Sequence, residues 1–167
     1  MRLMKKRTAA FSLVELVIVI VIIGVIAAIA VPRIGRGAKG AADSALRANL
    51  ATLRNAIDLY AVEHGGKFPA STTATSAAFE NELTQKTDVS GNVGTTANVH
   101  IYGPYLRQLP PLPVGAKKGQ TAVDVQATGP ASAAGDFGWV YNNTTGDIKA
   151  NTTDAEVDDS NIKYNTY

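Results

Sequence analysis

One stretch of the sequence restricts its possible folds more than any other. From Leu16 to Val31, sixteen consecutive residues are apolar, and the only charge in residues 11–32 is Glu15. At about 1.5 Å of rise per residue, an α-helix of residues 11–32 would be about 33 Å long, which is close to the hydrocarbon thickness of a bilayer. We expect this stretch to lie in a membrane or in a bundle of its own copies.

The ten residues before this stretch form a cationic leader, typical of segments held on the cytoplasmic side of a membrane. A secretory signal peptide also begins with positive charge, but its apolar region is about 7–15 residues long and is followed by a small-residue cleavage site. Here the apolar run is longer, and the small residues Ala9 and Ala10 precede it. Cleavage at these alanines would remove the charges and keep the helix.

Residues 5–32, KKRTAAFSLVELVIVIVIIGVIAAIAVP, resemble the class III signal of type IV pilins and type II secretion pseudopilins. In that family a prepilin peptidase cuts before a Phe and methylates its new amino group, and a Glu occupies the fifth mature position. The resemblance implies cleavage between Ala10 and Phe11, N-methylation of Phe11, and subunit assembly through Phe11 and Glu15. The residue before the cut is usually Gly in the family, whereas here it is Ala10.

The resemblance also implies a location and a set of partners. A pilin precursor spans the bacterial inner membrane once with its head outside the cytoplasm, and it then enters a periplasmic or surface fibre. Its partners are prepilin peptidase, an inner-membrane assembly platform, membrane lipid, and further copies of itself in a helical fibre. On this interpretation the chain divides into a cleaved leader (1–10), an assembly half of the helix (11–32), an amphipathic half (33–65) and a β-rich head (66–167).

Glu15 has two interpretations. Ser12-Leu13-Val14-Glu15 is a capping box, in which the Glu side chain accepts a hydrogen bond from the Ser12 amide at the positive end of the helix dipole. Alternatively, the α-amino group of Phe11 on a neighbouring subunit neutralises a carboxylate that is costly in hydrocarbon. Both roles are compatible, because the cap is needed only until a partner arrives.

Gly24 and Pro32 weaken the helix locally. They are either tolerated irregularities of a membrane helix or, as the resemblance implies, positions that soften the helix when it packs in a fibre. The sequence does not decide between these alternatives.

The helix is predicted to continue beyond Pro32, over residues 12–63. Apolar residues recur there at spacings of three and four, which places them on one face: Leu46, Leu50, Leu53, Ile57 and Tyr60. His64-Gly65-Gly66 is a typical helix end. The second half of the helix therefore requires a surface to cover its apolar face, and the remaining hundred or so residues are the candidate.

The rest of the chain predicts a small head. We expect a short helix at 79–86, strands at 99–102 and 122–126, and a hairpin over 137–150 around the turn 142–146. Four prolines at 104–113 exclude a central strand and predict an ordered loop, fixed to the core by Tyr105, Leu106 and Leu109. The predicted fold class is α+β and type IV pilin-like, with a long N-terminal helix packed on an antiparallel sheet of three or four strands.

Nothing in the sequence indicates an enzyme. The chain has no cysteine and no nucleophile, zinc-protease or phosphate-binding signature, and its two histidines, His64 and His100, are predicted at the surface or at an edge. Two features favour the pseudopilin branch. The GWVYN stretch resembles the C-terminal hairpin of many pseudopilin-like proteins, and many type IV pilins close their C-terminal region with a disulfide, which a chain without cysteine does not form.

The charged segments allow several partners. Asp154, Glu156, Asp158 and Asp159 form an acidic tail that is either solvated or supplies oxygen ligands for calcium, as related major pseudopilins do in a C-terminal loop. A basic collar at residues 33–39 suits lipid head groups or acidic neighbours, and lacks the interleaved aromatic residues of a nucleic-acid site.

One alternative to a fibre subunit remains open. The chain could be a monomeric, single-pass membrane-anchored module that binds a ligand through the Tyr- and Pro-rich loop at residues 102–114. A plain anchor has no use for a carboxylate in its apolar stretch, so Glu15 discriminates the two hypotheses.

Overall fold

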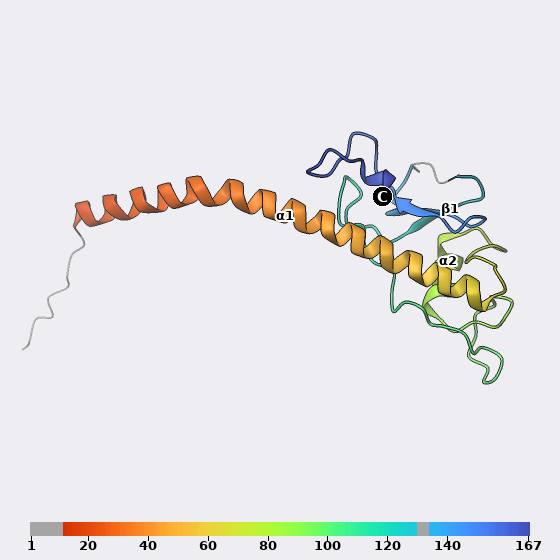
Figure 1. Ribbon diagram of the computed structural model, residues 1–167. Helices are drawn as coiled ribbons and strands as arrows, with labels where there is room; N and C mark the ends of the chain where they lie inside the picture. Colours follow the sequence, from red (N-terminus) through yellow and green to blue (C-terminus); the bar gives the residue numbers. More distant parts are fainter. Residues whose placement is uncertain (1–11, 130–133) are drawn as a thin grey trace, which may run out of the picture. The chain divides into compact units, whose positions relative to one another are not determined.

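The computed structural model describes residues 12–129 and 134–167, and for residues 31–36 it describes the backbone alone. Contacts divide the chain into two compact units, residues 1–38 and residues 39–167. The elements run in the order α1 (Leu13–Glu63), α2 (Ser76–Thr84), β1 (Val123–Gln126), β2 (Trp139–Asn142), β3 (Ile148–Ala150) and the 3₁₀ turn η1 (Tyr164–Thr166), as Figure 1 shows.

Helix α1 has the bounds that the sequence predicts. It follows Ser12 and is α-helical through Gly24 and Pro32 to Glu63. It ends because Gly65 and Gly66 take positive φ angles of 65° and 84°, which a Cβ would disfavour. The Gly66 amide then donates to the Ala61 carbonyl at 2.7 Å, so the last turn is closed as in a glycine C-cap.

The apolar face predicted for the second half of α1 is buried in the head. Leu46, Leu50, Leu53, Ile57 and Tyr60 are each at most 2% exposed. In Figure 1 this yellow-orange part of the helix runs beside the green and blue segments of the head. The 3.6-residue periodicity of the sequence therefore identified the correct buried face.

The fold class is confirmed as α+β and pilin-like, but the sheet is mixed instead of antiparallel. Its strand order is β1-β2-β3. β1 pairs with β2 in parallel, with Val123 opposite Trp139, whereas β2 and β3 form the predicted antiparallel hairpin. Parallel pairing needs a crossover of a dozen or more residues, and residues 127–138 provide a connection of that length. The sequence prediction located both strands but not their relative direction.

One hydrophobic core joins the second half of α1 to the sheet and to α2. All four residues of β2 are buried, and Trp139 and Tyr141 are among the largest fully buried side chains. Phe79 of α2 lies against Tyr141, with ring centroids 4.5 Å apart. Burial of such aromatic side chains is a large contribution to the stability of a domain of this size.

The proline-rich loop is fixed to the core as predicted. Leu109 is 4% exposed, and Tyr105 and Leu106 are partly buried against the same core. The Trp139 indole nitrogen donates to the Pro110 carbonyl at 2.9 Å, which gives the buried ring a polar partner.

The strand predicted at residues 99–102 is wrong. Within residues 99–102 only Tyr102 pairs, in an isolated bridge in which it and Thr87 exchange backbone hydrogen bonds of 3.1 and 3.2 Å. Val99 and Ile101 are exposed, so the alternating pattern does not mark one buried face. The apolar alternation was short, and such short runs are weak evidence for a strand.

Replacing Gly138 with Ala tests the close approach at the start of β2. A Cβ at Gly138 would lie 2.2 Å from the Gln120 carbonyl oxygen, so the backbone must shift. We expect Gly138→Ala to lower the free energy of unfolding by about 1–3 kcal/mol. The measurement is urea unfolding of the full chain in detergent micelles, followed by the fluorescence of Trp139.

Gly129→Ala is the matched control, because a Cβ there meets nothing within 4 Å. It should change the free energy of unfolding by less than about 0.5 kcal/mol. Equal effects of the two substitutions would contradict the packing described at β2.

Candidate assembly site

The first half of α1 presents apolar side chains to its surroundings on every side. Residues Leu13–Ala30 are long and apolar enough to cross a membrane, and none of this span is buried. Its large side chains are between 44% exposed, at Val17, and 77% exposed, at Leu13. Apolar surface of this extent requires lipid or protein to cover it.

The N-terminus of α1 forms the predicted capping box. The Ser12 amide donates to Oε2 of Glu15 at 2.9 Å, and the Val14 amide donates to Oγ of Ser12 at 3.3 Å. Two amides at the helix N-terminus thereby gain acceptors, and the carboxylate lies at the positive end of the helix dipole. This geometry holds the single negative charge of the apolar span at its very start.

Several predicted positions are not tested by this geometry. The cleavage site Ala10–Phe11 and the methylation site Phe11 lie outside the described residues. Helix α1 is continuous at Gly24 and Pro32, and a Cβ at Gly24 would meet nothing within 4 Å. Their role in softening the helix inside a fibre stays a prediction.

The fold and the exposed, acid-capped helix together define a pilin-like protein with an apolar assembly or anchoring helix. The family model of the prokaryotic N-terminal methylation motif matches residues 5–31. This motif is the class III prepilin signal of type IV pilins and pseudopilins, so the chain carries that signal. Searches of curated proteins and of solved structures gave no match to the chain.

The acidic tail residues are distributed over separate contacts. Asp154 accepts from Nζ of Lys163 at 2.7 Å, and Asp159 pairs with Lys39 at 3.1 Å. Glu156 accepts from the Thr153 amide at 2.7 Å. Within the described part of the chain, no three acidic, histidine or cysteine residues are placed to hold a metal ion. Calcium binding by this tail stays a prediction.

His64 is buried, so the prediction of a surface position is wrong. His64 is only 2% exposed, and its imidazole ring stacks on the ring of Tyr60 with centroids 3.8 Å apart. Nε2 of His64 lies 3.0 Å from Oγ1 of Thr87. The signal for this position was available, because His64 follows Tyr60 by four residues and extends the buried face of α1.

A buried carboxylate that the sequence did not reveal lies beside Tyr60. Glu82 of α2 is 7% exposed and accepts from the Tyr60 hydroxyl at 2.7 Å and from the Ala70 amide at 3.0 Å. Burial, followed by the hydrogen bond to Glu82, raises the pKa of Tyr60. Gly91 lies against this pair, since a Cβ there would be 2.5 Å from the Tyr60 hydroxyl. These contacts connect the end of α1 to the loop that follows α2.

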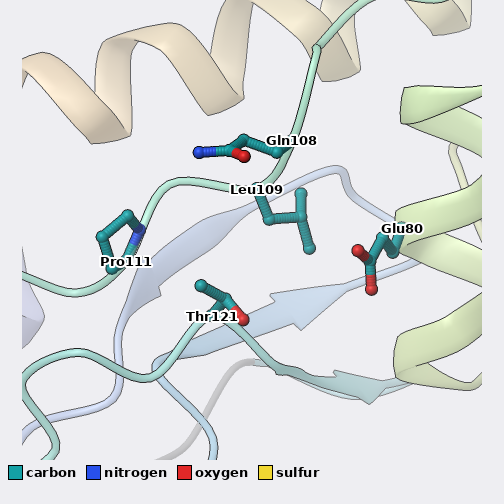
Figure 2. A pocket seen from close by; sticks show the side chains of 5 residues that line it. All are labelled: Glu80, Gln108, Leu109, Pro111 and Thr121. Atoms are coloured by element: carbon teal, nitrogen blue, oxygen red, sulfur yellow. The ribbon is translucent and has the colours of Figure 1, made fainter.

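The head also has a shallow hollow beside the proline-rich loop. Its volume is about 320 Å³, and Figure 2 shows that it is lined by Glu80 of α2, by Thr121 just before β1, and by Gln108, Leu109 and Pro111 of the loop. The hollow lies in the region where the ligand-binding alternative places its site. Its lining combines one carboxylate, one amide and one hydroxyl with two apolar side chains.

Because of the carboxylates in the acidic tail, we expect the head to lose stability in acid. The hydrogen bond from Lys163 lowers the pKa of Asp154, and that from Tyr167 lowers the pKa of Asp158. The stabilisation is therefore complete above the unfolded-state pKa of about 3.9 and is lost as the pH falls through the lower folded-state value. We expect the free energy of unfolding to fall steadily below about pH 4, as measured by urea titrations at a series of pH values.

The variant Asp158→Asn should reduce this dependence on pH, because it removes one of the carboxyl groups whose pKa is lowered in the folded chain. A slope equal to that of the unsubstituted chain would show that Asp158 does not contribute to stability as a carboxylate.

Proposed function

We propose that the chain is a structural subunit of a type IV pilus-like or type II secretion pseudopilus fibre. It would be processed by prepilin peptidase before Phe11, held in the inner membrane, and assembled with further copies of itself by an inner-membrane platform. The observation that carries this proposal is the exposed apolar span Leu13–Ala30 with one carboxylate at its start, inside the matched methylation motif.

The position of Glu15 supports assembly over simple anchoring. A carboxylate in an apolar span costs free energy in a membrane, and such groups are usually functional. Its hydrogen bond to the Ser12 amide holds it near the N-terminus that cleavage before Phe11 would create. An α-amino group on the Phe11 of a neighbouring subunit would then be a suitable partner of opposite charge.

A monomeric membrane-anchored module is the second candidate. The hollow at Glu80, Gln108 and Thr121 favours it, because a small polar ligand could contact all three side chains. If the chain is such a module, it would form no fibre, and Glu15 would serve only as a helix cap.

Two substitutions at Glu15 separate the charge from the cap. Glu15→Ala removes both, whereas Glu15→Gln keeps a side-chain oxygen that can accept from the Ser12 amide. If the carboxylate neutralises a neighbouring amine, both variants should remain in the membrane and should reduce fibre yield at least tenfold. The measurement is the ratio of sheared fibre to membrane-bound subunit in cells that carry the assembly machinery.

Ser12→Ala is the matched control, because it removes a cap hydrogen bond and leaves the charge. It should cost about 1 kcal/mol of helix stability and leave fibre yield near that of the unsubstituted chain. Fibres of Glu15→Gln at full yield would contradict the charge mechanism and leave capping as the role of Glu15.

A further inference from the structure

We infer that the side chains of Arg47 and Arg54 in helix α1 lock the C-terminal segment, residues 157–167, onto that helix, and that this lock needs no metal ion. The lock consists of Arg47 and Arg54 on α1 and of Asp158 and Tyr167 in the segment. It concerns the stability of the head and is independent of the proposed role in a fibre.

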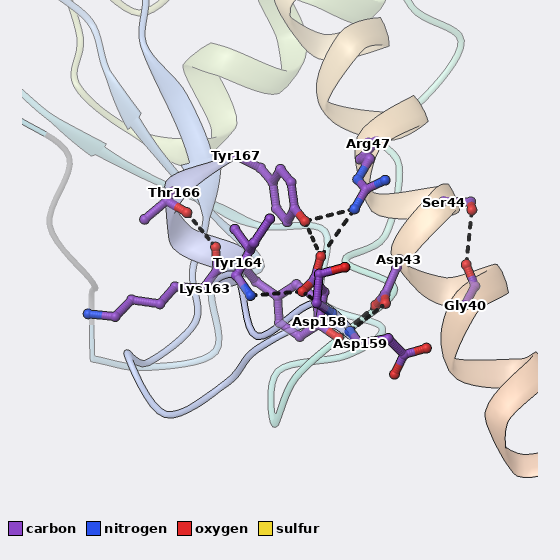
Figure 3. A network of polar contacts seen from close by, with 12 residues as sticks. Gly40, Asp43, Ser44, Arg47, Asp158, Asp159, Lys163, Tyr164, Thr166 and Tyr167 are labelled. Carbon is purple, nitrogen blue, oxygen red and sulfur yellow. Dashed lines mark hydrogen bonds and ion pairs between the residues drawn. The ribbon is translucent and has the colours of Figure 1, made fainter.

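Arg47 is the centre of the lock. Its Nη2 donates to Oδ2 of Asp158 at 3.1 Å and to the Tyr167 hydroxyl at 2.8 Å, as Figure 3 shows. The guanidinium carbon also lies 4.9 Å from the centroid of the Tyr167 ring. The Tyr167 hydroxyl donates in turn to Asp158. Three side chains thus form one closed group in which a cation contacts both a carboxylate and an aromatic ring.

Arg54 extends the lock along the same side of the helix. Its Nη2 donates to the main-chain oxygen of Tyr167 at 2.6 Å and to the Ile148 carbonyl at 3.2 Å. Because Arg47 and Arg54 are seven residues apart, they project from nearly the same side of α1. One helix surface therefore binds the segment and strand β3 together.

Asp43 adds a third attachment from the same side of α1. Its Oδ1 accepts from the Tyr164 hydroxyl at 2.6 Å, in a pair that is buried. Asp43 precedes Arg47 by four residues, one turn of the helix. The segment thus contacts α1 over the three turns from Asp43 to Arg54.

The acceptor atoms that calcium would need at Asp158 are already used. Oδ1 accepts from the amides of Ser160 and Ile162, both at 2.8 Å, and Oδ2 accepts from Arg47 and Tyr167. The side chain of Asp158 is 2% exposed, so little of it faces solvent. A calcium ion at Oδ2 would also lie beside the positive guanidinium of Arg47, which repels it. The residues around Asp158 therefore do not fit a calcium site.

Thermal unfolding of the full chain in detergent micelles tests the lock. The melting temperature of the unsubstituted protein should be the same in EDTA and in excess calcium chloride. Arg47→Met keeps most of the length of the side chain and removes the charge, and it should lower the melting temperature by about 3–6 °C in both solutions. Arg107→Met is the control, because Arg107 is an exposed arginine outside the lock, and it should melt within about 1 °C of the unsubstituted chain.

Local opening provides a second measurement. Hydrogen exchange of peptides that cover residues 157–167 should be at least tenfold faster in Arg47→Met, while peptides of β2 keep their protection. A melting temperature that falls in EDTA, or an Arg47→Met variant that melts and exchanges like the unsubstituted chain, would overturn the inference. Fibre yield is not part of this test, so failure of the lock and failure of the proposed function are distinguishable.

Discussion

The head depends on burial of the apolar face of α1, because its other elements have no separate core. Leu46, Leu50 and Leu53 are completely or almost completely buried, and they share one cluster with Trp139 of β2 and Phe79 of α2. A three-stranded sheet of three- and four-residue strands is too small to be stable alone. The helix therefore serves as the main packing surface, and the sheet, α2 and the proline-rich loop cover one side of it.

The two halves of α1 have different surroundings. The second half stabilises the head, and the first half carries the proposed function in a membrane or a fibre. After Lys39 most of the large apolar residues of α1 form one face that the head buries, with Leu59 and Val62 exposed, whereas over Leu13–Ala30 the large apolar residues are exposed all round. A helix that is apolar on all sides is stable only in lipid or in a protein bundle. A fibre whose core is made of such helices would provide the second environment after the membrane has provided the first.

The sequence predicted most features that follow from periodicity and from local turn chemistry. It located α1, its buried face, its glycine end and the hairpin β2-β3, because each is encoded by neighbouring residues. It failed where distant segments meet. The parallel pairing of β1 with β2, the burial of Glu82 beside Tyr60, and the contacts of Arg47 and Arg54 all join segments far apart in sequence. Two errors were local: the spacing from Tyr60 already indicated the burial of His64, and the alternation at residues 99–102 was too short to identify a strand.

Among the candidate functional residues, Glu15 was the position that the sequence identified most directly. A single charge in a long apolar run is visible without any structure, and the structure shows its carboxylate in the capping box with Ser12. The tail carboxylates were visible too, but their partners on α1 were not. Their contacts with arginine and lysine side chains give the acidic tail a structural role in the head.

The most direct test of the account is the mass of the subunit recovered from sheared fibres and from membranes of cells that carry the export machinery. Processing by prepilin peptidase predicts a chain that has lost residues 1–10, begins at Phe11 and carries the additional mass of one methyl group. A full-length chain in both fractions would contradict it and indicate an unprocessed anchor. A chain cut after Ala30 would contradict it as well, since the apolar helix would then be a discarded signal.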